Sequence, residues 1–251
     1  MHVKRVICVL VAATAVLTGL AAPASAAPVT LRFVTANVDF GVPQANVRQD
    51  WQNVIAPNAD IALLQETKSI RLADFVDTGT WLVLQDTSAE DRAGSALVIR
   101  RSVFTDRDTF GLVKGVDASP CPGGGIMTRW IAKVNIRLNN GRWIRVASLH
   151  MPPPRCQTGP GSPYDDMGFS IVNFVRGSDR LTVLGADWNK VVDDDPNDIA
   201  ARANLEPNGP NDGLRIDGFM YSRSLDNCCL ARLAAIHSEH RPIQIKMTIP
   251  S

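Results

Sequence analysis

The stretch RWIAKVNIRLNNGRWIRVASLH, residues 129–150, carries the firmest structural signal in the chain. Asn140-Gly141 separates two runs that are rich in β-branched, aromatic and other apolar residues, 130–138 and 142–149. An Asn-Gly pair between two such runs is the strongest short-range indication of a β-hairpin. The stretch therefore predicts two neighbouring antiparallel strands.

The register of this hairpin predicts which side chains share a face. With Asn140 and Gly141 as the central residues of the turn, paired residue numbers sum to 281, so Ile131 would lie opposite His150. Arg129, two positions along the strand, would then share a mostly polar face with His150. The other face would collect the apolar residues Trp130, Ala132, Val134, Ile136, Ala147 and Leu149.

Outward from the hairpin, further apolar runs alternate with loops rich in glycine and proline. Helical spacing of apolar residues marks 44–56, which reaches Pro57, and 167–175. No linker separates domains, so many strands with few helices predict a two-sheet sandwich with helices outside. The expected strands are 29–36, 61–64, 81–84, 95–99, 181–184, 214–221 and 242–249, and the expected loops are 119–125, 151–163 and 206–213.

The composition is that of a globular protein, with 45% hydrophobic residues, 20% charged residues and a net charge of +1 over 251 residues. Lys4 and Arg5 precede a charge-free apolar run, 6–20, and Ala24-Ser25-Ala26 matches a cleavage site. Residues 1–26 are therefore interpreted as a secretory signal peptide, and 27–251 as one exported domain. Its 24 basic and 25 acidic residues give a charge of −1, with no membrane anchor and no general attraction to polyanions.

Export would place the remaining cysteines in an oxidising compartment, where disulfides form. Continuing the hairpin ladder brings Cys156 opposite Gly125 and close to Cys121, which predicts a Cys121–Cys156 disulfide. Cys228 and Cys229 would form a vicinal bridge or stay free, and the sequence leaves both open. The cysteine spacings do not match a zinc-ligand pattern.

Polar residues recur where apolar strands end or begin, and they are the candidate site. A single acid at a strand end is usually solvated, and a single histidine is usually structural, but here they recur across one domain. The strand-end residues are Asn37, Glu66, His150, Asp187 and Asn189, followed by Asp217 within a strand and Glu239 and His240 before the last one.

This order resembles the endonuclease/exonuclease/phosphatase superfamily, the DNase I type of metal-dependent phosphohydrolase. The resemblance implies an α+β fold, a four-layer α/β sandwich of two packed, mostly antiparallel sheets flanked by helices. It also implies a Mg²⁺-dependent phosphoric ester hydrolase. The matching segments are TANVDFG, DIALLQETK, AGSALVIRR, VASLHMPPP, LTVLGADWN, LRIDGFMYS and HSEHRP.

The sequence departs from the family pattern in three places. Ala186 replaces the glycine that usually precedes the aspartate of the G-D-x-N motif, here Asp187. Ser238-Glu239-His240 stands where the family usually has Ser-Asp-His, and the longer glutamate can move or weaken a cation. The acid that often partners the family's first histidine has two candidates here, Glu90 and Asp91.

The resemblance implies roles that suit the chemistry of these residues. Glu66 is the leading Mg²⁺ ligand, supported by Asn37 and Glu239, and the same oxygen donors also suit Mn²⁺ or Ca²⁺. His240 would be the general base or orient the attacking water, with its ring fixed by Asp217.

The other candidates face the phosphate. Asp187 would align the water, and Asn189 would donate to a phosphoryl oxygen. His150 would bind the phosphate or protonate the leaving group. Arg129 follows from the hairpin register: it would clamp the scissile phosphate with its guanidinium fork, or else it is a solvated strand residue.

Three further features have a functional and a structural interpretation. His237 is interpreted as a structural or surface residue. The run 193–195, three aspartates, would hold calcium or, as we prefer, form a solvated acidic loop. Trp188 would stack on a base or, as we prefer, pack at a strand end.

Three functions agree with these observations. The first is a secreted, monomeric nuclease that cleaves DNA, or RNA, by metal- and histidine-assisted attack of water. The second is a phosphodiesterase or phosphatase acting on a lipid or small-molecule phosphate, as a sphingomyelinase does. The third is an inactive binding protein on the same scaffold. Retention of both histidines with their acidic partners argues against the third, and the lack of a long apolar hairpin argues against a lipid substrate.

Overall fold

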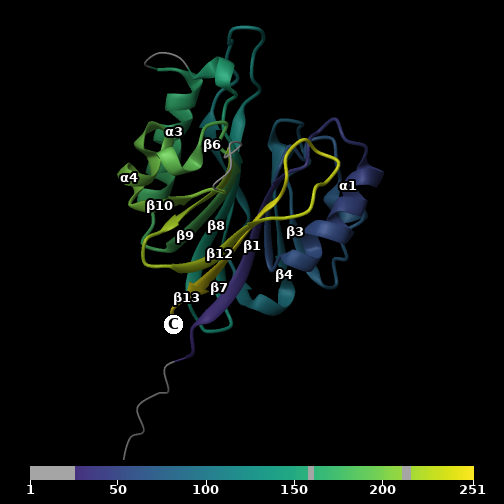
Figure 1. Ribbon diagram of the computed structural model, residues 1–251, viewed down its shortest axis with the longest axis vertical. Helices are drawn as coiled ribbons and strands as arrows, with labels where there is room; N and C mark the ends of the chain where they lie inside the picture. Colours follow the sequence, from purple (N-terminus) through teal and green to yellow (C-terminus); the bar gives the residue numbers. More distant parts are fainter. Residues whose placement is uncertain (1–25, 158–160, 211–215) are drawn as a thin grey trace, which may run out of the picture.

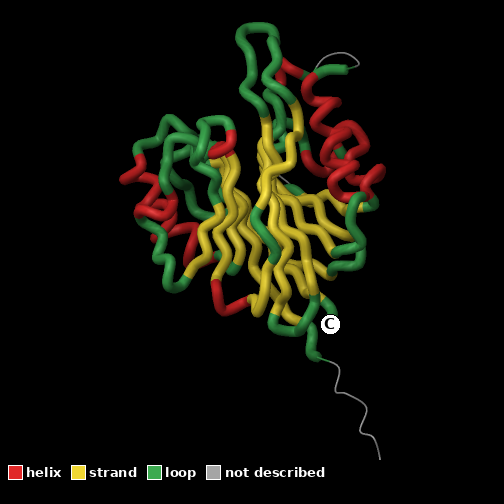
Figure 2. Tube along the Cα trace, turned by 180° about the vertical axis from the view of Figure 1, so that it is seen from behind, coloured by secondary structure: helices red, strands yellow, loops and turns green. Residues whose placement is uncertain are grey.

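The computed structural model describes residues 26–157, 161–210 and 216–251. The expected signal peptide therefore lies almost wholly outside the described residues. Two sheets pack face to face, with α1 on the outer face of one sheet and α3 and α4 on the outer face of the other (Figures 1 and 2). This is the four-layer α+β sandwich expected from the sequence.

The described residues form one sheet of six strands and one of seven. The first has the order β12 (Asp226–Arg232), β13 (Ile243–Ile249), β1 (Val29–Asn37), β2 (Ile61–Gln65), β4 (Ser95–Arg100) and β3 (Trp81–Leu84). The second has the order β10 (Leu205–Asn208), β11 (Asp217–Ser222), β9 (Leu181–Asp187), β8 (Trp143–His150), β7 (Arg129–Leu138) and β5 (Phe104–Arg107), with β6 (Gly111–Val116) also pairing with β7.

Each sheet contains one parallel pair of strands. β1 runs parallel to β2, and β8 runs parallel to β9, whereas the other pairs are antiparallel. Parallel neighbours end at the same edge of a sheet. The carboxyl ends of β1 and β2 therefore lie together, as do those of β8 and β9.

The helices cover the two outer faces. α1 (Gln44–Asp50) continues through a π-helical turn, Trp51–Ile55, into α2 (Ala56–Asn58), close to the expected helix 44–56. α3 (Pro163–Arg176) starts at Ser162, whose hydroxyl accepts the N–H of Asp165. α4 (Ile199–Ala203) is a short helix beside it. Single 3₁₀ turns span Leu72–Asp74, Arg92–Gly94, Arg101–Val103, Pro154–Cys156, Val192–Asp194 and Pro196–Asp198.

The core lies in three layers because each sheet buries both faces. Alternate residues of the inner strands, such as Phe33, Leu63 and Val146, fill the space between the sheets. The residues that alternate with them in each strand face the helices. Trp51 and Ile55, in the π-helical turn, pack against the outer face of the first sheet, where the ring of Trp51 contacts that of Trp81 edge to face. Burial on both faces explains why these strands are almost continuously apolar.

The hairpin pairs one residue away from the predicted register. β7 and β8 align Ala132 with Ser148, so paired residue numbers sum to 280. Gly141 has a φ of 84°, and its N–H donates to the carbonyl of Leu138. Asn140-Gly141 therefore ends a three-residue loop with a left-handed glycine, instead of forming a two-residue turn. The predicted division of the hairpin into faces was wrong for this reason.

The strands that the sequence did not predict all lie at sheet edges. Two of them, β10 and β12, are the outermost strands of their sheets. The other two, β5 and β6, both pair with β7 at the edge of the second sheet. None of the residues of β12 is buried, so its sequence shows no apolar alternation. β10 contains Pro207, inside a stretch that was expected to be a loop. The short helix α4 was also missed.

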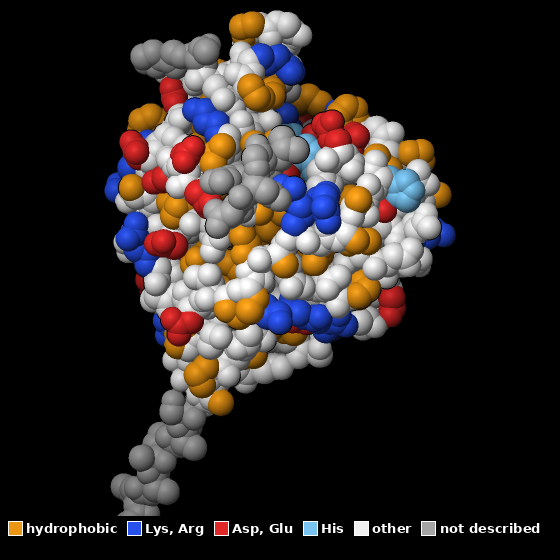
Figure 3. Space-filling view, in the orientation of Figure 1, with side chains coloured by type: hydrophobic (Ala, Val, Ile, Leu, Met, Phe, Trp, Pro, Cys, Tyr) orange, Lys and Arg blue, Asp and Glu red, His pale blue; other side chains and the backbone are white. Residues whose placement is uncertain are grey.

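The Cys121–Cys156 disulfide is present as predicted, although the register that suggested it is shifted by one residue. Cys228 and Cys229 are both exposed and free, so the second expected alternative holds. Among the described residues, no helix has the length and apolar character needed to cross a membrane. On the face shown in Figure 3, acidic and basic side chains are interspersed.

Gly185 lies where the two sheets are closest. A Cβ atom there would meet Leu63 Cδ1 at 2.4 Å and Leu63 Cβ at 2.9 Å. We expect Gly185→Ala to lower the free energy of unfolding by about 1–3 kcal/mol and the Tm by roughly 2–4 °C for each kcal/mol. Gly94→Ala is the control, because a Cβ there meets nothing within 4 Å. Equal Tm values for the two variants in a thermal melt would contradict this packing.

Candidate active site

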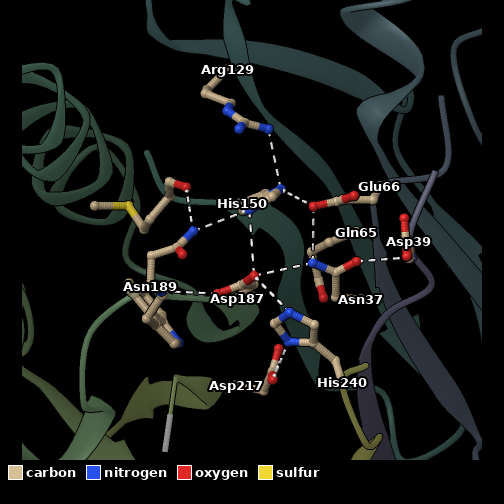
Figure 4. A network of polar contacts seen from close by, with 12 residues as sticks. Asn37, Asp39, Gln65, Glu66, Arg129, His150, Asp187, Asn189, Asp217 and His240 are labelled. Carbon is tan, nitrogen blue, oxygen red and sulfur yellow. Dashed lines mark hydrogen bonds and ion pairs between the residues drawn. The ribbon is translucent and has the colours of Figure 1, made fainter. Parts of the chain in front are cut away.

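The strand ends bring most of the predicted site residues together (Figure 4). Asn37 is the last residue of β1, and Glu66 follows the last residue of β2. His150 and Asp187 end the parallel strands β8 and β9 as register partners. Asp217 starts β11 directly opposite Asp187, because β11 runs antiparallel to β9.

Asp187 is the centre of the cluster. Its side chain is 2% exposed, and Oδ2 accepts from Asn37 Nδ2 at 3.1 Å. The same oxygen lies 3.4 Å from His150 Nε2 and 3.9 Å from His240 Nε2, whereas Oδ1 accepts the backbone N–H of Asn189. Burial, followed by the negative charge of Asp217, raises the pKa of Asp187 to about 7.

Glu66 lies across from Asp187. Its Oε1 accepts from the same amide nitrogen of Asn37 at 3.2 Å and lies 3.6 Å from His150 Nδ1. Its Oε2 accepts the backbone N–H of Phe40. Glu66 and Asn189 have φ values of 58° and 52°, in the left-handed region that non-glycine residues rarely occupy. Such strain is concentrated at functional sites.

The ring of His150 is buried between Arg129 on one side and Glu66 and Asp187 on the other. Burial, followed by the positive charges of Arg129 and His240, holds the pKa of His150 well below its usual value. Arg129 Nη1 lies 3.1 Å from His150 Nδ1. A guanidinium only donates, so Nδ1 accepts from Arg129, whereas Nε2 lies 3.1 Å from Asn189 Nδ2 and 3.4 Å from Asp187 Oδ2. Both ring nitrogens therefore have polar neighbours, and phosphate binding and protonation of the leaving group both stay predictions for His150.

His240 is held by Asp217. Nδ1 of His240 lies 2.7 Å from Asp217 Oδ2, which leaves Nε2 facing Asp187. Burial alone would lower the pKa of His240, but the hydrogen bond and charge of Asp217, with the charge of Asp187, outweigh it and raise the pKa to about 9. Asp217 Oδ1 is buried and has no hydrogen-bond partner among the described residues.

Three acidic candidates lie away from the cluster. The side chain of Glu239 is 87% exposed, and its Oε1 lies 3.9 Å from His240 Nε2, so Glu239 is at the rim. Glu90 pairs with Lys68, and Asp91 accepts from the indole of Trp130. Neither of these two acids partners His150; the side chain that lies 3.1 Å from its Nδ1 is that of Arg129.

The other features have structural roles. His237 Nδ1 lies 2.7 Å from the buried Asp50, a partner that the sequence reasoning missed. Trp188 is fully buried, and its Nε1 donates to the carbonyl of Gly218, as the packing interpretation expected. In the acidic run, Asp195 accepts the first free N–H groups of α4.

The donor set fits a divalent cation. Ligand atoms of Asp187, Asp217 and His240 lie within 4.8 Å of one another. Glu66 and Asp187 share one amide, Asn37, which offsets only part of the repulsion between their carboxylates. Carboxylate oxygens suit hard cations such as Mg²⁺, and the unpartnered Asp217 oxygen is one more free donor.

Comparison with known proteins adds the fold class. No model of a protein family matches the chain, and no curated protein matches it. Solved structures do match over most of its length. An endonuclease/exonuclease/phosphatase family protein from Bacteroides thetaiotaomicron is 16% identical, with a TM-score of 0.62, covering 89% of this chain and 99% of that one.

Two further matches have the same character. A mannosyl-6-phosphatase from the same bacterium is 16% identical, with a TM-score of 0.56, covering 86% of this chain and 99% of that one. The human Nocturnin catalytic domain, whose structure holds a sulfate anion, is 14% identical, with a TM-score of 0.59, covering 89% and 94%. The chain therefore has the fold of endonuclease/exonuclease/phosphatase proteins.

Cation binding at this cluster has a test that needs no turnover. We expect Mg²⁺ or Mn²⁺ to raise the Tm of the protein, since a ligand at a hundred times its Kd adds roughly 2.7 kcal/mol to the stability of the folded state. Glu66→Gln should abolish this shift. Glu90→Gln is the matched control, because Glu90 pairs with Lys68 outside the cluster. An unchanged wild-type melt in millimolar Mg²⁺, Mn²⁺ and Ca²⁺ would contradict the site.

Proposed function

We propose that the chain is a Mg²⁺-dependent phosphodiesterase whose substrate is a nucleic acid, DNA or RNA. One observation carries the proposal: Glu66, Asp187 and both histidines, from segments far apart in the sequence, meet in one cluster at the ends of the central strands. The fold shared with phosphatase and nuclease-named proteins supports it.

Glu66 and Asp187, with the amide of Asn37, would hold the cation. A bound divalent cation polarises a phosphoryl oxygen and lowers the pKa of a water molecule. In the reaction, the water oxygen would bond to phosphorus while the bond from phosphorus to the leaving oxygen breaks; the water would pass a proton to Nε2 of His240, and the leaving oxygen would take up a proton.

The side chains of the cluster divide this work by position. Asp217 occupies Nδ1 of His240, so only Nε2 is left to exchange a proton with the attacking water. Asn189 Nδ2, next to His150 Nε2, is placed to donate to a phosphoryl oxygen. Arg129 supplies a planar cationic fork on the other side of His150 and would clamp the phosphate.

The surface around the site favours a nucleic acid over a membrane lipid. Among the described residues, the exposed large hydrophobic side chains are those of Phe40, Met127 and Phe169. Docking on a bilayer needs a broader apolar surface. A phosphodiesterase or phosphatase acting on a lipid or small-molecule phosphate, as the mannosyl-6-phosphatase fold relative suggests, is the second candidate.

The activity test compares substrates and cation conditions. We expect the purified protein to cleave plasmid DNA or RNA in Mg²⁺ and not in EDTA, and to leave sphingomyelin and mannose 6-phosphate intact. His240→Ala should lower kcat by about 10²–10⁴-fold, because it removes the group that exchanges the proton of water. His237→Gln is the control, because that histidine binds Asp50 outside the cluster.

Two results would contradict the proposal. Cleavage of sphingomyelin or mannose 6-phosphate without cleavage of nucleic acid would replace the substrate. Full turnover by a folded His240→Ala variant would remove the mechanism.

We also propose that the domain is exported as a monomer after cleavage near Ala26. The leader pattern and the Cys121–Cys156 disulfide support this, since disulfides persist in oxidising compartments. When the chain is expressed with its native N-terminus in a secreting host, the protein recovered from the culture medium should begin at Ala27. Its Cys121 and Cys156 should resist alkylation until the disulfide is reduced. Retention of the full-length chain inside the cells would contradict this.

A further inference from the structure

A cavity of about 290 Å³ opens beside the candidate active site and shares three of its residues. Glu66, Arg129 and His150 form the wall toward the catalytic cluster. The remaining lining residues are Phe40, Lys68, Trp130, Arg155 and those within 90–95 and 125–128. The cavity is large enough for more than the scissile phosphate alone.

The charges in this cavity are unevenly paired. Lys68 forms an ion pair with Glu90, and Asp91 accepts from Trp130, so these groups are already satisfied. Arg155 is exposed and makes no ion pair or hydrogen bond among the described residues. Arg129 and Arg155 both line the cavity. Arg155 is therefore a cation of this cavity without an ion-pair partner among the described residues, while Asp91, bonded to a neutral indole, keeps its negative charge.

The rim of the cavity is apolar. Phe40 is 50% exposed and Met127 is 40% exposed, and both line this cavity. Lys68 Nζ lies 4.0 Å from the ring centroid of Phe40 and 3.8 Å from Met127 Sδ, so one lysine lies between the two side chains. An exposed aromatic ring and a thioether beside a cationic wall match the chemistry of a nucleotide, which joins a flat base to a phosphate.

The disulfide restrains the backbone next to Arg155. It lies in the turn Pro154–Cys156, next to the bonded Cys156, which is 3% exposed. Its partner Cys121 precedes the 125–128 wall of the cavity. The disulfide thus connects the segment that carries Arg155 to the segment that leads into residues 125–128 of the cavity lining.

We propose that this cavity binds the nucleotide next to the scissile phosphodiester, with Arg155 binding its second phosphate and Phe40 and Met127 contacting its base. The inference rests on the proposed nuclease function and specifies its substrate: a strand with at least two neighbouring phosphates, and not an isolated diester.

Binding in EDTA tests the cavity without turnover. The probe is a fluorescent ten-residue oligothymidylate, with its Kd measured by anisotropy across a salt series. We expect Arg155→Gln to raise the Kd about tenfold at low salt and to reduce the slope of log K against log salt by about 0.7, the value for one phosphate contact on a single strand. Arg142→Gln, an exposed arginine at the far end of the hairpin, is the charge-matched control and should leave the slope unchanged.

The base contact has a separate signature. Phe40→Ala should raise the Kd by about tenfold through lost stacking, while the salt slope stays at the wild-type value. Thymidine 3′,5′-bisphosphate should displace the probe about tenfold better than either thymidine monophosphate, and Arg155→Gln should remove this advantage.

The outcomes separate this inference from the proposed function. An unchanged salt slope in Arg155→Gln, or equal competition by the bisphosphate and the monophosphates, would overturn the cavity assignment while leaving the hydrolase intact. Conversely, if nucleic acid is not cleaved in Mg²⁺ but the slope changes as expected, the hydrolase proposal fails and the binding site stands.

Discussion

The candidate active site depends on one buried polar contact between the two sheets. Gln65 Nε2 at the end of β2 lies 3.0 Å from Ser148 Oγ in β8 and 3.3 Å from the carbonyl of Gly185 in β9. Ser148 in turn donates to the carbonyl of Leu64. Since buried polar groups are costly unless paired, these bonds allow only one alignment of the two sheets at this end. That alignment places Glu66 opposite His150, and the close approach excludes a side chain at 185.

The same alignment concentrates negative charge, which the surrounding structure only partly compensates. Glu66 and Asp187 share the Asn37 amide on one side of the cluster, and on the other side Asp187 and Asp217 both face the His240 ring. The left-handed backbone at Glu66 adds strain at the same place. A cluster that is strained and rich in carboxylates is poor for stability alone, and the cation that we propose for this site would offset the repulsion between its carboxylates.

The sequence predicts those parts of the fold in which burial forces a pattern. Strands buried on both faces, such as β2 and β9, are visible as apolar runs, and polar residues after them are visible as strand ends. The edge strand β12 has no buried residue, so no pattern marks it. The hairpin register failed for a different reason, because the Asn-Gly pair fits both a two-residue and a three-residue turn. Gly141 has a positive φ in either turn, whereas the two-residue turn also needs a positive φ at Asn140, which Asn140 does not have.

The strand-end residues lie together although the register of the hairpin is shifted by one residue. By alternation from the observed register, Arg129 would point away from His150, yet its guanidinium reaches Nδ1 from the first residue of β7. Side chains at strand ends are free to turn around the edge of the sheet, so their position along the chain matters more than the face that they start from. Glu239 was misplaced because it follows a loop and ends no strand. Arg155 was missed because it lies in the expected loop 151–163, where no strand alternation indicates the direction of a side chain.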